Sequence, residues 1–149
     1  DEAARWGSGR ARYQAGRCLT RSVAGGEWST AQQACTDAIR LAQQTGNTTD
    51  LSDAYGAMGM LQLRWALAGA TNGAAEATHL QYAVNYFSQA VSANRDSGAQ
   101  AALYLYANGV ALDCLGRQIE GNRLMREALS ADRGVESRFL AHRIRHCQA

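Results

Sequence analysis

Cysteine and histidine are the residues whose chemistry and spacing could define a site in this chain. The cysteines are Cys18, Cys35, Cys114 and Cys147, and the histidines are His79, His142 and His146. No two cysteines form a CxxC pair, so the usual zinc and redox motifs are absent. His142 and His146 are four residues apart, so on one helix face they could hold a metal with Cys147 or Glu136. A solvated pair at a helix end, where positive charge suits the helix dipole, explains the same spacing.

Catalytic motifs are not evident elsewhere in the sequence. There is no GxSxG, no HExxH and no phosphate-binding loop. The glycines at 7–9 and 69–73 have no preceding strand, which a nucleotide-binding loop requires. We therefore expect no enzymatic activity and no cofactor.

The charge is modest and unevenly distributed. All 15 basic residues are arginines, and the net charge is +2, too small to indicate a nucleic-acid partner by itself. Residues 1–26 contain five arginines and two acids, residues 27–98 three arginines and six acids, and residues 117–149 seven arginines and four acids. Arg138, Arg143 and Arg145 leave a nucleic-acid contact open as an alternative, but no aromatic stacking platform accompanies them. We expect no nucleic-acid partner.

The elements that must position these residues are helices. The 149 residues are 46% hydrophobic and 19% charged, which is typical of one globular domain. Proline is absent, good helix formers dominate, and no run of about 18 apolar residues indicates a membrane span. Glycine-containing or Asx/Thr-rich breaks divide the chain into seven expected helices. Their spans are 2–23, 28–44, 50–69, 74–95, 99–115, 118–131 and 135–147.

A spacing of small, large and small residues recurs along these helices. The three copies are Ala31–Cys35–Ala38, Ala83–Phe87–Ala90 and Gly121–Met125–Ala128. In the most regular copy, Gly109 is followed by Gly116 and then by Gly121. Small residues let two helices approach closely, and the large residue one turn away fills the remaining gap. This pattern resembles the tetratricopeptide repeat (TPR), a family of stacked helical hairpins; an irregular helical bundle with coincidental spacing is the alternative.

The resemblance implies an all-α, right-handed superhelix in a single domain. Its hairpins would comprise residues 2–44, 50–95 and 99–131, and a capping helix at 135–147 would cover the exposed end. The resemblance also implies a non-catalytic scaffold that binds a protein or peptide in a concave groove, with self-association as a further possibility. The groove residues, placed by offset from Gly16, Gly59 and Gly109, are Tyr13, Arg17, Thr20, Gly56, Met60, Leu63, Tyr106, Val110 and Asp113. Such a surface suits an amphipathic or acidic segment.

The cysteines bear on the compartment. Cys18 lies seven residues before Gly25 and Cys35 nine after Gly26, so an antiparallel hairpin places them at nearly the same height. Cys114 and Cys147 lie on helices that contact each other in the TPR family. We expect disulfides Cys18–Cys35 and Cys114–Cys147, and hence a periplasmic or secreted protein. The alternatives are small buried thiols, as in a cytoplasmic TPR-type secretion chaperone, and a metal- or nucleic-acid-binding module using the C-terminal helix.

Overall fold

The fold of the chain was obtained as a computed structural model, which describes residues 2–24, 27–68, 73–95, 98–144 and 146–147. These residues form seven helices and no strand. The helices are α1 (Glu2–Ala24), α2 (Trp28–Thr45), α3 (Thr48–Leu67), α4 (Gly73–Ala93), α5 (Ala99–Cys114), α6 (Gln118–Ala131) and α7 (Val135–Leu140). The all-α prediction is confirmed, and the first six helices match their expected ends to within two residues.

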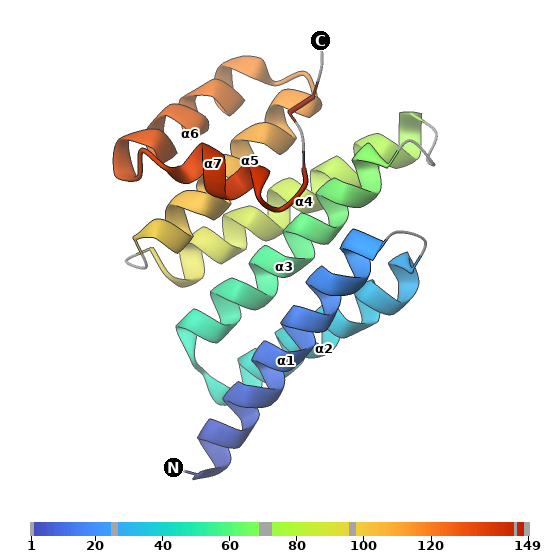
Figure 1. Ribbon diagram of the computed structural model, residues 1–149, viewed down its shortest axis with the longest axis vertical. Helices are drawn as coiled ribbons and strands as arrows, with labels where there is room; N and C mark the ends of the chain where they lie inside the picture. The colour runs from blue at the N-terminus through green and yellow to red at the C-terminus, as the bar shows by residue number, and fades with distance from the viewer. Residues whose placement is uncertain (1, 25–26, 69–72, 96–97, 145, 148–149) are drawn as a thin grey trace.

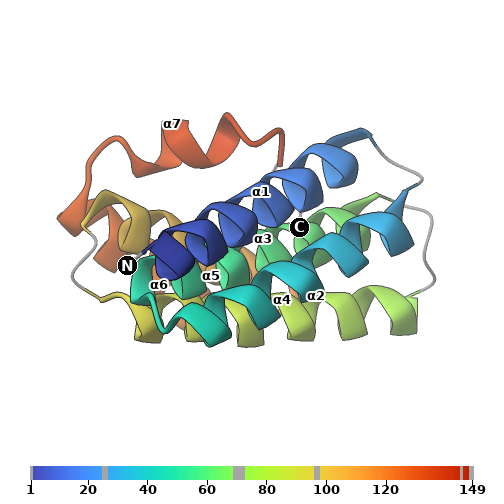
Figure 2. The same cartoon turned by 90° about the horizontal axis from the view of Figure 1, so that it is seen from below.

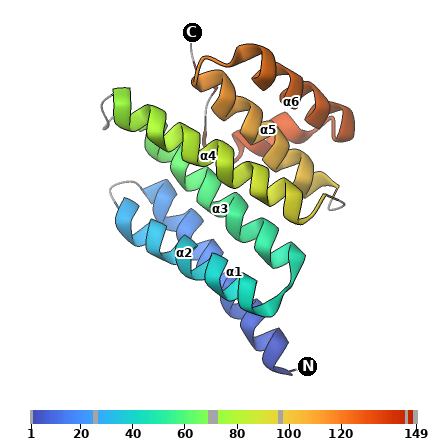
Figure 3. The same cartoon turned by 180° about the vertical axis from the view of Figure 1, so that it is seen from behind.

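The first six helices pack as three hairpins, α1 with α2, α3 with α4 and α5 with α6 (Figure 1). The hairpins stack so that α1, α3 and α5 form one layer and α2, α4 and α6 the other (Figures 2 and 3). Local signals set the turns. Gly46 ends α2 in the left-handed conformation with φ 69°, and the side chain of Asn47 then accepts a hydrogen bond from the N–H of Asp50 to begin α3.

The predicted close contact between helices lies where the sequence places its small residues. A Cβ added to Gly109 would lie 2.7 Å from the carbonyl oxygen of Gly121, so α5 and α6 approach backbone to backbone. In the neighbouring hairpin, a Cβ on Gly59 would lie 2.7 Å from the ring of Phe87. In these two hairpins a small residue on one helix therefore makes room for the facing helix, which allows close packing.

An aromatic ladder connects the first two hairpins. Trp28 stacks on Trp65 with 5.6 Å between ring centroids, and Trp65 stacks on His79 at 4.3 Å. These three rings come from α2, α3 and α4, so Trp28 binds the second hairpin as well as its own. Offset stacking of this kind adds about 0.5–1.5 kcal/mol to each pair beyond the area that it buries.

The last helix is shorter than predicted. We expected a helix over 135–147, but α7 ends at Leu140. Arg143 has a left-handed backbone with φ 61°, which is incompatible with a continuing helix. The turn it makes directs Ile144 into the core, where that side chain is 3% exposed. Burial of Ile144 and the bond at Cys147 outweigh the local helical preference of the segment.

Candidate interaction surface

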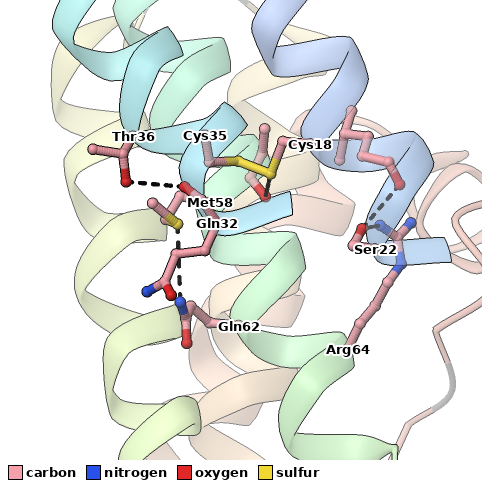
Figure 4. Close-up of a disulfide and its surroundings, with 10 residues drawn as sticks. Cys18, Ser22, Gln32, Cys35, Thr36, Met58, Gln62 and Arg64 are labelled. Atoms are coloured by element: carbon pink, nitrogen blue, oxygen red, sulfur yellow. Dashed lines mark hydrogen bonds between the residues drawn. A yellow bond between two sulfur atoms is a disulfide. The ribbon is translucent and has the colours of Figure 1, made fainter. Parts of the chain in front are cut away.

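Both predicted cysteine pairs lie at disulfide geometry. The Cα atoms of Cys18 and Cys35 are 5.2 Å apart, and those of Cys114 and Cys147 are 5.4 Å apart. The first bond joins α1 to α2, as Figure 4 shows, and both of its cysteines are fully buried. The second bond joins the end of α5 to Cys147. No described cysteine is free.

Described residues between 135 and 147 form what we call the C-terminal segment, and it lies over the layer of α1, α3 and α5 (Figure 2). Phe139 packs against Tyr106 of α5 with 5.3 Å between ring centroids. The Tyr106 hydroxyl forms a hydrogen bond with Nε2 of His146, at 2.6 Å. Burial and the nearby carboxylate of Glu136 raise the pKa of Tyr106 to about 12. Tyr106 is thus neutral near pH 7, and its hydrogen bond with His146 anchors this segment.

Arg64 provides a second anchor for the C-terminal segment. Its Nη2 donates to the carbonyl oxygen of His142 at 2.8 Å, and its Nη1 donates to Ser22 Oγ at 2.6 Å. Figure 4 shows this side chain reaching from α3 to the end of α1. Burial lowers the pKa of Arg64 to about 10, and it remains charged at neutral pH. Burial, with the charges of Arg64 and Arg138, lowers the pKa of His142 below its usual 6.5.

Most of the predicted groove residues on α3 and α5 are buried. Those inside the core are Gly56, Met60, Leu63, Tyr106 and Val110. Asp113 is half-buried. Gly56 lies against the ring of Tyr104, so it serves the packing of α3 on α5. In this arrangement these five positions hold the stack together, and contact with a partner there would require the helices or the C-terminal segment to move.

The three predicted residues on α1 lie on a different kind of surface. Tyr13 is 64% exposed, Thr20 is exposed and Arg17 is half-exposed. Trp6, 72% exposed, and Arg10 continue the same face toward the N-terminus at helical spacing. We call Trp6, Arg10, Tyr13, Arg17 and Thr20 the α1 stripe. Sequence reasoning missed Trp6 and Arg10, although their offsets of seven and three residues from Tyr13 identify them.

The α1 stripe is positively charged and borders a hollow. Arg17 Nη1 donates to Gln14 Oε1 at 3.4 Å, and among the described residues neither Arg10 nor Arg17 has a carboxylate within ion-pair distance. A hollow of about 640 Å³ includes Tyr13, Arg17 and Thr20 in its lining. Thr20 also borders a smaller hollow shared with Ala141, His142 and Arg143. The open surface therefore extends from α1 onto the C-terminal segment.

The histidine pair is not arranged for metal binding. His142 and His146 do not share a helix, because α7 ends before both of them. Cys147 is in a disulfide and cannot supply a thiolate. Among the described residues, no three His, Cys, Asp or Glu side chains are grouped so that they could hold a metal.

The C-terminal arginines that suggested a nucleic-acid contact are partly engaged within the chain. Arg138 pairs with Asp132 at 2.5 Å and donates to the carbonyl oxygen of Ala99. Hydrogen bonds from the Gly134 N–H and from Arg138 lower the pKa of that aspartate. Arg143 is exposed, and Arg145 lies outside the described residues. The described part of the segment thus offers one open arginine.

Known proteins add no further constraint. The chain matches no family model, no curated protein and no solved structure. Among the described residues, no helix has the length and apolar character needed to cross a membrane.

Proposed function

We propose that this chain is a non-catalytic scaffold of the tetratricopeptide type, which binds an acidic segment of another protein along the α1 stripe. The observation that carries the proposal is the exposure of Trp6 and Tyr13 on one face of α1, together with two arginines, Arg10 and Arg17, that pair with no carboxylate among the described residues. Tryptophan, tyrosine and arginine dominate binding hot spots, and here they share one face of a helix.

Charge complementarity selects the partner. Helix α1 contains five arginines and one glutamate. Arg21 pairs with Glu27 at 2.8 Å and Arg12 lies 3.8 Å from Asp50, whereas Arg5, Arg10 and Arg17 have no ion pair with a described side chain and can meet an incoming acidic chain. Opposite charges at an interface raise the association rate and disfavour the wrong partners. An acidic segment with apolar side chains matches both the arginines and the aromatic rings.

The compartment we propose is the periplasm or the exterior of the cell. Two cysteine pairs at disulfide geometry support an oxidising environment, because such bonds rarely persist in the reducing cytosol. The superhelical twist of the TPR family belongs to this proposal as well. It is supported by the stacked hairpins and by the contact of Gly109 with Gly121.

Site-specific photo-crosslinking tests the binding proposal. A photoreactive phenylalanine analogue replaces Tyr13, and the protein is exposed to the periplasmic and extracellular proteins of its source organism. The matched control has the same analogue at Tyr82, which is 48% exposed on α4 in the other layer. We expect one dominant crosslinked protein from position 13 and none from position 82, with an acidic peptide identified at the crosslink by mass spectrometry.

Charge reversal then separates binding from folding. Arg17→Glu should abolish the crosslink at position 13 and leave the melting temperature nearly unchanged, because a half-exposed side chain at the surface contributes little to stability. Equal crosslinking at positions 13 and 82, or a basic peptide at the crosslink, would contradict the proposal.

A further inference from the structure

A pocket of about 690 Å³ lies beside the Cys114–Cys147 disulfide, and no residue of the α1 stripe lines it. Its walls come from the last turns of α1, α3 and α5, the starts of α2 and α4, and the C-terminal segment. This volume is within the range of small-molecule sites, which is about 300–1,000 Å³. The pocket is therefore large enough for a compact organic ligand.

Arg64 is the unusual residue in this pocket. Its side chain is 9% exposed, yet among the described residues no carboxylate lies within ion-pair distance of it. Within the described part of the chain, the guanidinium binds a hydroxyl and a carbonyl oxygen, and its Nε has no hydrogen-bond partner there. Buried charges are normally paired, because removal from water without a counter-charge is unfavourable. An anion in the pocket would supply the charge that the described residues do not.

Arg143 adds a second cation at the mouth of the pocket. It is exposed, it lines the pocket, and its left-handed backbone has φ 61°. A bulky residue in that conformation is strained, and such strain gathers at functional sites. Glycine, which has no Cβ, or asparagine, which tolerates the left-handed region, would fit the turn with less strain. The arginine at this turn is thus better explained by its side chain than by its backbone.

The balance of charge and apolar surface defines the ligand. Among the described residues, the charged side chains that line the pocket are Arg64, Arg143 and Glu76, which leaves a surplus of one positive charge among these three. That surplus suits a monoanion better than a phosphate with two negative charges. Trp28, Leu67 and Ile144 provide an apolar wall, which suits a hydrocarbon body attached to the anionic group.

From this geometry we infer that the pocket binds a small monocarboxylate with an apolar tail, whose carboxylate contacts Arg64 and Arg143. Carboxylate and guanidinium match in planarity and form paired, charge-assisted hydrogen bonds. The apolar tail lies against the Trp28 ring and the neighbouring aliphatic side chains. This site is independent of the α1 stripe, so either proposal can fail without the other.

Titration of the ¹⁵N-labelled protein with octanoate tests the inference. Binding is monitored by NMR through the resonances of the indole N–H groups. Trp28 lines the pocket, and Trp6 on α1 serves as an internal reference outside it. We expect the Trp28 signal to shift in a saturable manner while the Trp6 signal stays in place. Octanamide, which is uncharged and nearly the same size, should bind about tenfold more weakly or worse, as expected for loss of one charge-assisted contact.

Two substitutions locate the carboxylate. Arg64→Gln should weaken octanoate binding about tenfold or more, and Arg143→Gln should weaken it a few-fold, because the second contact is exposed to solvent. Arg123→Gln, on the exposed face of α6, is the matched control and should change nothing. Should Arg64→Gln fail to fold, Arg143→Gln and the octanamide comparison still decide the question.

Three results would overturn the inference. One is no saturable shift of the Trp28 signal at millimolar octanoate. Another is equal affinity for octanamide, which would mark the pocket as merely apolar. The third is a parallel shift of Trp6 and Trp28, which would show unspecific association with the surface.

Discussion

Arg64 of α3 donates a hydrogen bond to the carbonyl oxygen of His142, 78 residues further along the chain. The bond ties the C-terminal segment to α3, in the layer that the segment covers. Together with the disulfide at Cys147, it helps to hold the segment in place. The face that the TPR resemblance assigns to a partner is therefore partly covered by the chain itself. What remains open is the side that belongs to α1.

Both cysteine pairs should be oxidised in protein prepared without reductant. Intact mass should be lower than that of the fully reduced chain by two hydrogen atoms per bond, and thiol reagents should not react. Replacing both Cys18 and Cys35 by alanine should lower the free energy of unfolding by about 3 kcal/mol. The Cys114–Cys147 bond closes a longer loop, 33 residues against 17, so replacing both of its cysteines should cost about 0.6 kcal/mol more. Four reactive thiols in the native protein would contradict this pairing.

Tyr106 and Tyr13 were both predicted to line the groove, but substitutions at the two positions should differ in their effect on the free energy of unfolding. Tyr106 is 2% exposed and packs against Phe139, so Tyr106→Ala should lower the free energy of unfolding by about 3–5 kcal/mol. Tyr13→Ala removes an exposed ring and should change stability by less than about 0.5 kcal/mol. Urea denaturation of the two variants side by side checks this. A similar loss for both would mean that Tyr13 is also part of the core.

Gly109 and Gly16 provide a matched pair of glycine substitutions within helices. Gly109→Ala would place a methyl group 2.7 Å from the carbonyl oxygen of Gly121, which should destabilise the protein by about 1–3 kcal/mol. Gly16→Ala meets no atom within 4 Å and should stabilise it by about 0.5–1 kcal/mol, since alanine is the better helix former. Thermal unfolding followed by circular dichroism measures both. A harmless Gly109→Ala would show that α5 and α6 are farther apart than described.

Stability should fall as the pH drops below neutral. Burial, with Arg64 and Arg138 nearby, lowers the pKa of His142 in the folded state, and burial lowers that of His79. The unfolded chain therefore takes up protons first as the pH falls through 6.5, which favours unfolding until the folded-state pKa values are reached. Denaturation midpoints at pH 7.5, 6.5 and 5.5 should decrease in that order.

A histidine substitution assigns that pH dependence. His142→Gln removes one of the two groups and should flatten the profile between pH 7.5 and 5.5. His146→Gln serves as the comparison, since this residue lies in the same segment. A profile that His142→Gln leaves unchanged would place the effect elsewhere in the chain.

The fold could be predicted because its signals are local. Gly46 and Asn47 end one helix and begin the next by their own backbone and side-chain bonds, and counting residues from a turn was enough to pair Cys18 with Cys35. The end of α7 was not predictable in this way. No glycine or proline marks the segment after Leu140, and the left-handed turn at Arg143 is imposed by burial of Ile144 and by the distant Cys114.

The candidate surface was only partly predictable for a similar reason. Helical spacing places Tyr13, Arg17 and Thr20 on one face, and the same spacing includes Trp6. It does not tell which face another part of the chain will cover. Tyr106 and Val110 fit the groove pattern equally well, yet their burial depends on Phe139 and the packing of the stack. Nothing near Arg64 in the sequence marks it as a buried cation.

The Cys114–Cys147 bond closes α6 and α7 into a covalent ring. A protease that cuts the backbone anywhere between these two cysteines leaves both fragments attached through sulfur. Cleavage after the exposed Arg143, for example, would give two chains on a reducing gel and one on a non-reducing gel. Outside the cell, where proteases are abundant and thiols scarce, such a ring would let the molecule survive nicking with its C-terminal segment still in place.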